Sequence, residues 1–481
     1  MGLLGIVLGL ALLVGLAFRG WSVLLLAPIA ALVAALLSGE PLLAHWTQTF
    51  MGSAAHFLAQ FFPLFLLGAL FGKLMEDSGS VTVIADAMIR KLGQRRAVLA
   101  VVLAGAIVTF GGVSLFVAFF VLAPMAAQVF RAADVPRRLM PAAIALGTST
   151  FTMSAFPGTP SIQNAIPMPF FGTTPFAAPG LGILASIIML VFGMAWLGRV
   201  EAAARKAGEG FGGMATAGNT DAGGLRERAA TAHEFDTAEL SRGGESKTAP
   251  SLLLAALPLV VVILVNMAMS LVILPSLDLA YLAEPRFGET SLAGVGGVWA
   301  VITALASAIV VVLAINFRRL TAVRATIDAG ANASVLPVLS VASLVGFGAV
   351  VAAMPAFQIV SDWVLGIGGG PLVSLAAATN ILSALTGSAS GGLTIALDAL
   401  GPTYLERAAA IGMDPALLHR VAVMASGTLD SLPHNGAVVT LLAVCGVSHR
   451  EGYRDIVMVG IVGAMIALVA VILLGGLFGS F

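Results

Sequence analysis

Residues 147–164 read GTSTFTMSAFPGTPSIQN and lie inside an apolar stretch, 139–170, that is long enough to cross a lipid bilayer. Seven hydroxyl side chains, a glutamine and an asparagine share this segment with two prolines and a glycine that interrupt a helix. Unwound backbone at membrane depth is tolerated only where it is buried in protein or lines a water-filled cavity. The segment therefore predicts a discontinuous membrane helix that lines a polar site.

A second interrupted segment, residues 426–436, reads SGTLDSLPHNG and lies inside the apolar stretch 415–445. It contains Asp430 and His434, and ionisable side chains within a membrane segment are functional by default. Both groups can exchange a proton, so the segment predicts a place where a coupling proton binds. The alternative is structural: His434 bonds a free carbonyl, or Asp430 caps the following half-helix.

The whole chain has the composition of a membrane protein. Of its 481 residues, 59% are apolar and 10% are charged, whereas a soluble chain has about 25% charged residues. The formal net charge of zero does not indicate nucleic-acid binding, and the single cysteine, Cys445, excludes a disulfide framework and a thiolate metal cluster. Neither a complete nucleophile–base set nor paired His-rich or Asp-rich motifs can be recognised, so we expect no enzyme, no metal and no cofactor.

Many apolar stretches have the length of a membrane span. The expected spans are 3–18, 22–37, 54–75, 139–170, 181–198, 251–274, 292–317, 332–356, 415–445 and 456–480. Two further apolar stretches, 97–130 and 371–405, are interrupted by glycine and predict re-entrant hairpins, because each arm is short for a crossing. Two ordinary spans in each stretch are the alternative. The predicted fold class is an all-α polytopic membrane protein.

The basic residues orient these spans in the membrane. Of 24 lysines and arginines, only Arg286, Arg407 and Arg420 fall on one side when ten spans and two hairpins alternate. By the positive-inside rule the other side is cytoplasmic, so both termini are expected to be periplasmic in a bacterial inner membrane. The first apolar stretch lacks the basic n-region of a signal peptide and is expected to be a retained helix.

Three regions follow from this organisation. Residues 1–198 and 251–481 are expected to be an N-terminal and a C-terminal membrane half, and the polar residues 199–250 a flexible cytoplasmic linker.

The two membrane halves repeat one pattern. A shift of 280 residues places Gly111-Gly112 over Gly391-Gly392, and it carries Gly147-Thr148 to the equivalent pair in the second break without a gap. The expected topology opens the two hairpins to opposite sides, so the repeats are inverted. Inverted repeats with discontinuous helices are typical of secondary transporters, which bind substrate near the midplane where the breaks meet.

The breaks and the hairpin tips supply the candidate site residues. The expected substrate-binding residues are Thr148, Ser149, Thr150, Thr152, Ser154, Pro157, Gly158, Thr159, Ser161, Gln163, Asn164, Gly111, Gly112, Ser114, Thr386, Gly387, Ser388, Ser390, Gly391, Gly392, Ser431 and Asn435. The expected proton-coupling residues are Asp430, His434 and Asp398; for Asp398, a position at the outer mouth is the alternative. For the hydroxyl side chains, the alternative is that they only pack helices together.

The charge of the substrate can also be inferred. No arginine or lysine is expected at membrane depth, so helix N-termini and hydroxyl groups, with help from His434, would hold the anion. This favours a small monoanion over a di- or tricarboxylate.

The two breaks resemble those of the gluconate permease family of proton symporters. The resemblance rests on GTSTFT and FPGTPSIQNAIP in residues 147–167 and on DSLPHNG in residues 430–436, and it extends over essentially the whole chain. It implies inverted repeats, elevator-like motion and uptake of hydroxy acids or amino acids into bacteria. Gluconate and D-serine members carry a His-Pro-Gly-Pro type first break. Here residues 157–160 read PGTP without histidine, which is similar to the D-beta-hydroxybutyrate permease branch.

These observations predict a proton-coupled symporter that takes up a small hydroxymonocarboxylate by alternating access. The first choice of substrate is 3-hydroxybutyrate; gluconate, other sugar acids and D-serine are the alternatives, and Na⁺ is the alternative coupling ion. The expected partners are a small organic anion, the coupling ion and the lipid bilayer, with a homodimer as one option and no nucleic acid. An intramembrane enzyme and a channel are the alternatives from other functional classes.

Overall fold

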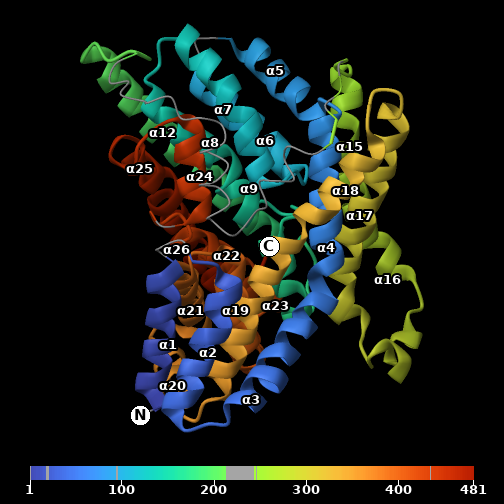
Figure 1. The fold of residues 1–481 in the computed structure, drawn as a ribbon, viewed down its shortest axis with the longest axis vertical. Helices are drawn as coiled ribbons and strands as arrows, with labels where there is room; N and C mark the ends of the chain where they lie inside the picture. Colours follow the sequence, from blue (N-terminus) through green and yellow to red (C-terminus); the bar gives the residue numbers. More distant parts are fainter. Residues whose placement is uncertain are drawn as a thin grey trace.

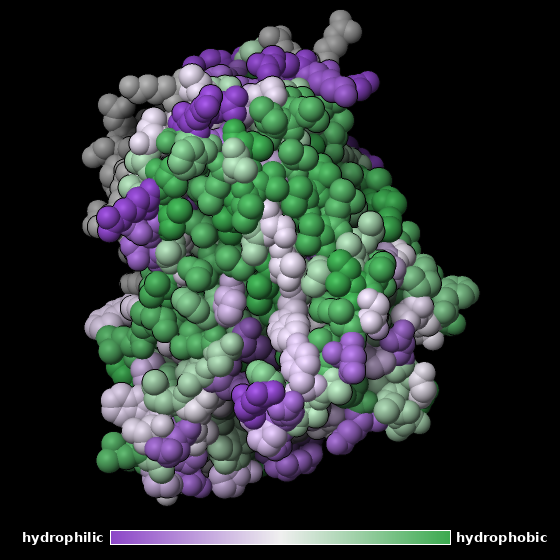
Figure 2. Space-filling model, turned by 90° about the vertical axis from the view of Figure 1, so that its right-hand side faces the viewer, coloured by the Kyte–Doolittle hydropathy of each residue, from purple (hydrophilic) through white to green (hydrophobic). Residues whose placement is uncertain are grey.

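The computed structural model describes residues 2–17, 21–93, 96–212, 243–244, 246, 248–433 and 435–481. In these residues every regular element is a helix, which confirms the all-α fold class. Helical segments long and apolar enough to cross a membrane are Leu42–Asp77, Leu115–Ala132, Pro179–Lys206, Leu252–Ser276, Leu292–Asn316, Val323–Ala353 and His449–Phe478. Figure 2 shows a broad apolar surface between two polar ends, as expected of a protein embedded in a bilayer.

Both glycine-interrupted stretches form helical hairpins. The first joins α6 (Ala97–Phe110) to α7 (Leu115–Ala132), and the second joins α21 (Gly370–Thr386) to α22 (Ala389–Ala410). Gly112 at the first tip has φ +95°, a backbone conformation that residues other than glycine rarely adopt. At Gly392 a Cβ atom would lie 2.3 Å from the backbone of Ser383, so glycine allows the arms of the second hairpin to pack closely.

Both predicted breaks are present. The first interrupted helix consists of α8 (Met140–Thr148), α9 (Phe151–Ser154), α10 (Ile162–Ala165) and α11 (Pro167–Phe171). The second consists of α23 (Pro415–Thr428) and α24 (Gly436–Cys445). Gly158, between the two prolines of the first break, has φ +78°. Proline and glycine therefore end regular helix where the sequence indicates.

The elements recur in the same order in each half. In the first half α4 (Met51–Asp77) and α5 (Ser80–Leu92) precede the hairpin, and α12 (Pro179–Lys206) follows the interrupted helix. In the second half the corresponding elements are α18 (Val323–Ala333) with α19 (Val335–Ala353), α20 (Phe357–Leu365), and α25 (His449–Ile456) with α26 (Gly463–Phe478). Figure 1 shows α6 and α7 in the upper half and α21 and α22 in the lower half, as inverted repeats require.

Further helices complete the bundle. α1 (Gly2–Ala17) packs on α2 (Val23–Ser38), and α2 packs on α19 through a cluster that includes Leu26 and Phe347. α15 (Leu252–Ala268) packs on α17 (Leu292–Asn316), and α17 packs on α4. These helices lie around the elements that form the site.

The start of the expected linker is helical. α12 extends to Lys206, well beyond residue 198, and Glu209 after it bonds Arg138 at 2.7 Å. Arg138 also contacts Asp455 of α25 at 3.2 Å. Through Arg138, the segment after α12 is therefore connected to the first repeat and to α25 of the second repeat. Residues 213–242, 245 and 247 of the expected linker lie outside the described residues.

Candidate functional site

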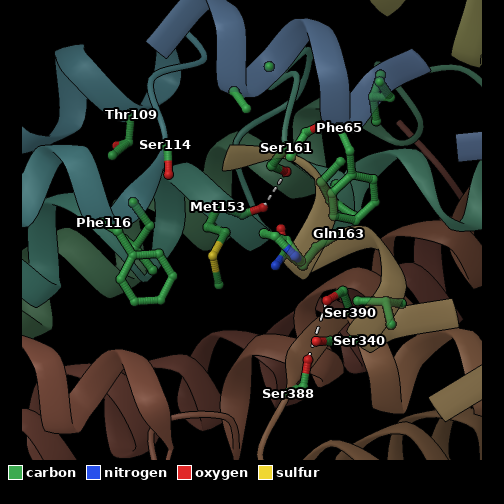
Figure 3. A pocket seen from close by; sticks show the side chains of 18 of the residues that line it. Phe65, Thr109, Ser114, Phe116, Met153, Ser161, Gln163, Ser340, Ser388 and Ser390 are labelled. Carbon is green, nitrogen blue, oxygen red and sulfur yellow. Dashed lines mark hydrogen bonds between the residues drawn. The ribbon is translucent and has the colours of Figure 1, made fainter. Parts of the chain in front are cut away.

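A cavity of about 300 Å³ lies where the two hairpin tips and the first break meet α4 and α19. Figure 3 shows Ser114, Met153, Ser161 and Gln163 on one side of it, and Ser340, Ser388 and Ser390 on the other. The second break also reaches the cavity, because Gly436 at the start of α24 lines it. The cavity therefore draws residues from both repeats.

The structure places part of the expected site in this cavity. The expected residues that line it are Gly112, Ser114, Thr148, Thr152, Thr159, Ser161, Gln163, Thr386, Gly387, Ser388 and Ser390. The expected residues that do not line it are Gly111, Ser149, Thr150, Ser154, Pro157, Gly158, Asn164, Gly391, Gly392, Asp398, Asp430, Ser431 and Asn435. His434 lies outside the described residues, and Asp398 is exposed on α22.

The lining also contains residues that sequence reasoning missed. Thr109 lies two residues before the glycine pair of the first hairpin, and this position at a predicted tip is the signal that could have identified it. Ser334 and Ser340 come from α18–α19, where isolated serines in an apolar span give no signal. Phe65 and Phe116 supply apolar wall. No residue described as lining the cavity has a charged side chain, so its polarity comes from hydroxyls, one amide side chain and the backbone.

Most hydroxyls of the first break are already hydrogen-bonded within the protein. Thr148 donates to the carbonyl of Ile144 at 2.7 Å, and Ser161 donates to the carbonyl of Met153 at 2.8 Å (Figure 3). Thr159 differs, because its Oγ1 is buried and finds no hydrogen-bond partner in the part of the chain that the structure describes. A buried hydroxyl in this state is free to bind a ligand that enters the cavity.

The helix N-termini at the cavity are capped differently. In the second repeat the hydroxyl of Ser388 accepts from the amide of Gly391 at 3.2 Å, and the side chain of Asn435 accepts from the amide of Ala437 at 2.8 Å. The side chain of Ser114, at the start of α7, makes no capping hydrogen bond. The first-turn amides of the 18-residue helix α7, with its positive dipole end, can therefore bind an anion beside the Ser114 hydroxyl.

Asp430 is one side chain away from the cavity. The Nδ2 of Asn435 donates to Asp430 Oδ1 at 2.7 Å and to the carbonyl of Gly387 at 2.8 Å. Gly387 lies at the second hairpin tip and lines the cavity. Asn435 therefore links the carboxylate in the second break to the hairpin tip. A change in the charge of Asp430 would alter the hydrogen bonds of Asn435, including the one to the tip.

Buried polar side chains fix the shape of the first break. Asn164 donates to the carbonyls of Thr159 and Pro175, each at 3.0 Å, and its Oδ1 lies 3.2 Å from the Nε2 of His419. His419 on α23 also lies 2.6 Å from the hydroxyl of Thr173. Asn164 thus positions the backbone of Thr159 rather than lining the cavity.

The sequence predicts no arginine or lysine at membrane depth, yet the structure buries two basic side chains inside the protein. Arg420 lies within α23 and is fully buried, and it donates to the carbonyls of Ala155 at 3.0 Å and Ala177 at 2.6 Å. Lys73 is also buried, and it pairs with Asp77 at 2.9 Å. Neither side chain lines the cavity, so basic residues are present inside the protein but stabilise backbone or carboxylates there.

Comparisons with known proteins place the chain among membrane transporters. No family model matches it. The "Uncharacterized transporter YxjC" of Bacillus subtilis (strain 168) is 39% identical over 486 residues, which cover 99% of this chain and 100% of that protein. The high-affinity gluconate transporter of Escherichia coli (strain K12) is 32% identical over 162 residues, which cover 33% of this chain and 35% of that protein.

Solved structures show the same fold at low identity. The YdaH transporter of Alcanivorax borkumensis matches with a TM-score of 0.52 and 16% identity, over 91% of this chain and 88% of that one. MtrF of Neisseria gonorrhoeae, described within a class of antimetabolite efflux pumps, matches with a TM-score of 0.54 and 14% identity, over 91% and 85%. Given the full-length match at 39% identity, this chain belongs to the same family of multi-pass membrane transporters as YxjC, and a third of it is similar to a gluconate transporter.

Proposed function

We propose that this transporter is a proton-coupled symporter that takes up a small hydroxymonocarboxylate. The first choice of substrate is 3-hydroxybutyrate, and gluconate-like acids are the second. The observation that carries the proposal is the uncharged cavity into which the uncapped start of α7 and the free hydroxyl of Thr159 open.

The lining suits one negative charge and one hydroxyl group. The start of α7 would bind the carboxylate through its first-turn amides and the hydroxyl of Ser114. Thr159 and Gln163 would bond the substrate hydroxyl, and the rings of Phe65 and Phe116 would contact its carbon chain. A di- or tricarboxylate would bring further charges into a lining whose described residues offer no cation to pair with them.

Asp430 would carry the coupling proton. Protonation would remove the negative charge that Asn435 now bonds, and Asn435 also holds the carbonyl of Gly387 at the hairpin tip. The proton could therefore change the position of the tip and let the loaded carrier move.

Alternating access would follow from motion of one part of the molecule against another. The hairpins and interrupted helices of the halves 1–198 and 251–481 would move as a unit against α4 and α17–α19, which flank them. The basic side, with the linker 199–250, would face the cytoplasm of a bacterium, and both termini would face the periplasm.

Uptake into proteoliposomes tests the substrate and the coupling ion together. The panel would contain labelled 3-hydroxybutyrate, gluconate and D-serine, with and without an inward proton gradient and with and without Na⁺ at fixed pH. We expect 3-hydroxybutyrate to accumulate against its gradient when the proton gradient is present. Accumulation of D-serine or gluconate alone would overturn the substrate, and accumulation that requires only a Na⁺ gradient would overturn the role of the proton.

The Asp430→Asn variant tests the proton carrier separately. We expect it to lose uphill uptake but to keep exchange of labelled for unlabelled substrate, because exchange does not require net proton movement. Asp362→Asn is the control, since Asp362 is exposed and bonds Gln358. Undiminished proton-driven accumulation by Asp430→Asn would refute the role of Asp430.

A further inference from the structure

Buried helix hydroxyls in this protein commonly bond to the backbone carbonyl one turn earlier. Thr148, Ser186 and Thr428 donate to the carbonyls of Ile144, Gly182 and Met424 at 2.7, 2.8 and 2.8 Å. Such bonds satisfy the hydroxyl inside the helix. A hydroxyl that is buried on a helix without this bond is therefore an exception that needs a reason.

Two such exceptions lie on α21, the first arm of the second hairpin. The hydroxyl oxygens of Thr379 and Ser383 are buried, with both residues 0% exposed, and neither has a hydrogen-bond partner in the part of the chain that the structure describes. Asn380, 7% exposed, is a third, because its Oδ1 has no partner there. The Nδ2 of Asn380 donates to the carbonyl of Ala376 at 2.9 Å. This bond fixes the orientation of the side-chain amide and leaves its Oδ1 available to a ligand.

The spacing of the three residues places them on one side of the helix. Residues three and four positions apart are neighbours on an α-helix, and Ser383 stands in this relation to both Asn380 and Thr379. α21 packs on α22 and α23, and Gly392 of α22 lies directly against the backbone of Ser383. This side of the helix is enclosed by protein, and its three unpartnered side-chain oxygens can each donate a lone pair to a ligand.

The chemistry of this face favours a monovalent metal cation. Hydroxyl and amide oxygens are hard ligands that suit alkali and alkaline-earth ions. The three atoms without a partner are all oxygens, whereas the Nδ2 of Asn380 already donates to the carbonyl of Ala376. The three side chains bring no carboxylate, which favours a single positive charge over a divalent ion.

The face lies close to the substrate cavity. Thr386, the last residue of α21, and Gly387 directly after it line the cavity and follow Ser383 by about one turn. The first hairpin lacks an equivalent, because the shift of 280 residues places Leu99, Ala100 and Leu103 at these three positions. A ligand bound here would act on one hairpin tip only.

We propose that Thr379, Asn380 and Ser383 bind Na⁺ inside the second hairpin. The ion would stabilise the packing of α21 against α22 and so the position of the tip at the cavity. This inference adds a cation site to the proposed function and rests on neither Asp430 nor the identity of the substrate.

Thermal unfolding of the purified full-length protein in detergent tests the site without substrate. We would titrate NaCl against choline chloride at constant ionic strength, with KCl as a second comparison. We expect a saturable rise in Tm with Na⁺. In Thr379→Val and Ser383→Ala the half-saturating Na⁺ concentration should increase about tenfold or more, as expected for the loss of one ligand worth about 1.4 kcal/mol.

The variants should fold, because replacing a hydroxyl that has no partner among the described residues removes none of the internal hydrogen bonds found there. In choline chloride their Tm should equal or exceed that of the unaltered protein. Thr394→Val is the matched control, since Thr394 lies on the other arm and donates to the carbonyl of Ser390 at 2.7 Å; it should keep the Na⁺ response. Absence of a Na⁺-specific rise, or the same rise in all variants, would overturn the site and leave the proposed transport untouched, since the three oxygens would then hold water.

Discussion

Thr159 combines burial with a hydroxyl that has no hydrogen-bond partner among the described residues. It is 1% exposed and lines the cavity, while Asn164 holds its carbonyl at 3.0 Å. The backbone is thus fixed and the side chain is kept for a ligand. A buried hydroxyl without a hydrogen-bond partner lowers the stability of the folded protein by about 1–3 kcal/mol. A ligand that bonds this hydroxyl would offset that cost.

The Thr159→Val variant tests this interpretation. The two side chains have nearly the same shape, so we expect the protein to fold with unchanged or slightly higher Tm. The KM for the transported acid should rise about tenfold, which corresponds to loss of one hydrogen bond worth about 1.4 kcal/mol. Initial rates of uptake into proteoliposomes measure it.

Thr428→Val is the matched control for that variant. Thr428 is equally buried but donates to the carbonyl of Met424 at 2.8 Å and does not line the cavity. It should lose some stability and keep its KM. An unchanged KM in Thr159→Val would remove Thr159 from the binding site.

At the residue scale the sequence predicted polar positions but not the state of each. The Pro- and Gly-rich segment 157–164 indicated Thr159, Ser161 and Gln163, and all three line the cavity. It could not distinguish a hydroxyl satisfied by a carbonyl, as in Ser161, from a free one, as in Thr159. That distinction depends on rotamers and on the path of the chain around the break.

Arg420 shows a second limit of sequence reasoning. A charged residue near the start of a predicted span resembles the end of a loop. Its function here depends on two carbonyls, of Ala155 and Ala177, that are more than 240 residues away along the chain. Only the tertiary structure brings them together.

The second hairpin depends on close approach of its two helices. A Cβ atom at Gly392 would lie 2.3 Å from both the Cα and the N of Ser383, and backbone cannot move aside as a flexible side chain can. We therefore expect Gly392→Ala to separate the arms and lower stability by about 1–3 kcal/mol, as overpacking commonly does. The Tm of the protein in detergent measures the effect.

Gly476→Ala is the control at this scale. Gly476 lies within α26, and a Cβ atom there would meet nothing within 4 Å. Alanine has the higher helix propensity, so this variant should be as stable as the unaltered protein or slightly more stable. Equal stability of both variants would show that the arms do not pack as closely as the structure indicates.

At the element scale the sequence predicted hairpins and breaks well and short helices poorly. Glycine at the tips and proline in the breaks act locally, so their effect is visible without tertiary structure. The sequence analysis did not predict α5 and α20, because helices of 13 and 9 residues are too short to be recognised as spans. The extension of α12 to Lys206 was also missed, because its polar turns are stabilised by contacts such as that of Glu209 with Arg138.

At the scale of the whole molecule, one repeated pattern organises the fold. The order of span, hairpin and broken helix was readable because the glycine pairs and breaks recur at one shift of 280 residues. The cavity was expected where the breaks meet, but its lining differs from a symmetric arrangement. Both hairpin tips line the cavity, but the first break supplies many lining residues, whereas Gly436 is the one described residue that the second break supplies.

The two repeats differ in which ligand their residues are placed to bind, and the sequence alone could not assign these roles. The uncapped start of α7 and Thr159 belong to the first repeat, and both open to the cavity. Asp430 and the oxygen cluster on α21 belong to the second repeat and lie behind its tip. We infer that the first repeat holds the anion and that the second repeat binds the coupling proton and the proposed Na⁺ ion.

The central claim is that tips from oppositely oriented repeats form one small-anion pocket, and protection from alkylation tests it most directly. Leu115→Cys and Ser390→Cys place a thiol at the first and the second tip, each in a Cys445→Ser background that removes the only native cysteine. Each variant in proteoliposomes would react with N-ethylmaleimide over a range of concentrations of the acid that it transports. The account predicts that the acid protects both thiols with the same half-maximal concentration, equal to its binding constant. Protection of one thiol and not the other, in variants that both transport the acid, would contradict it.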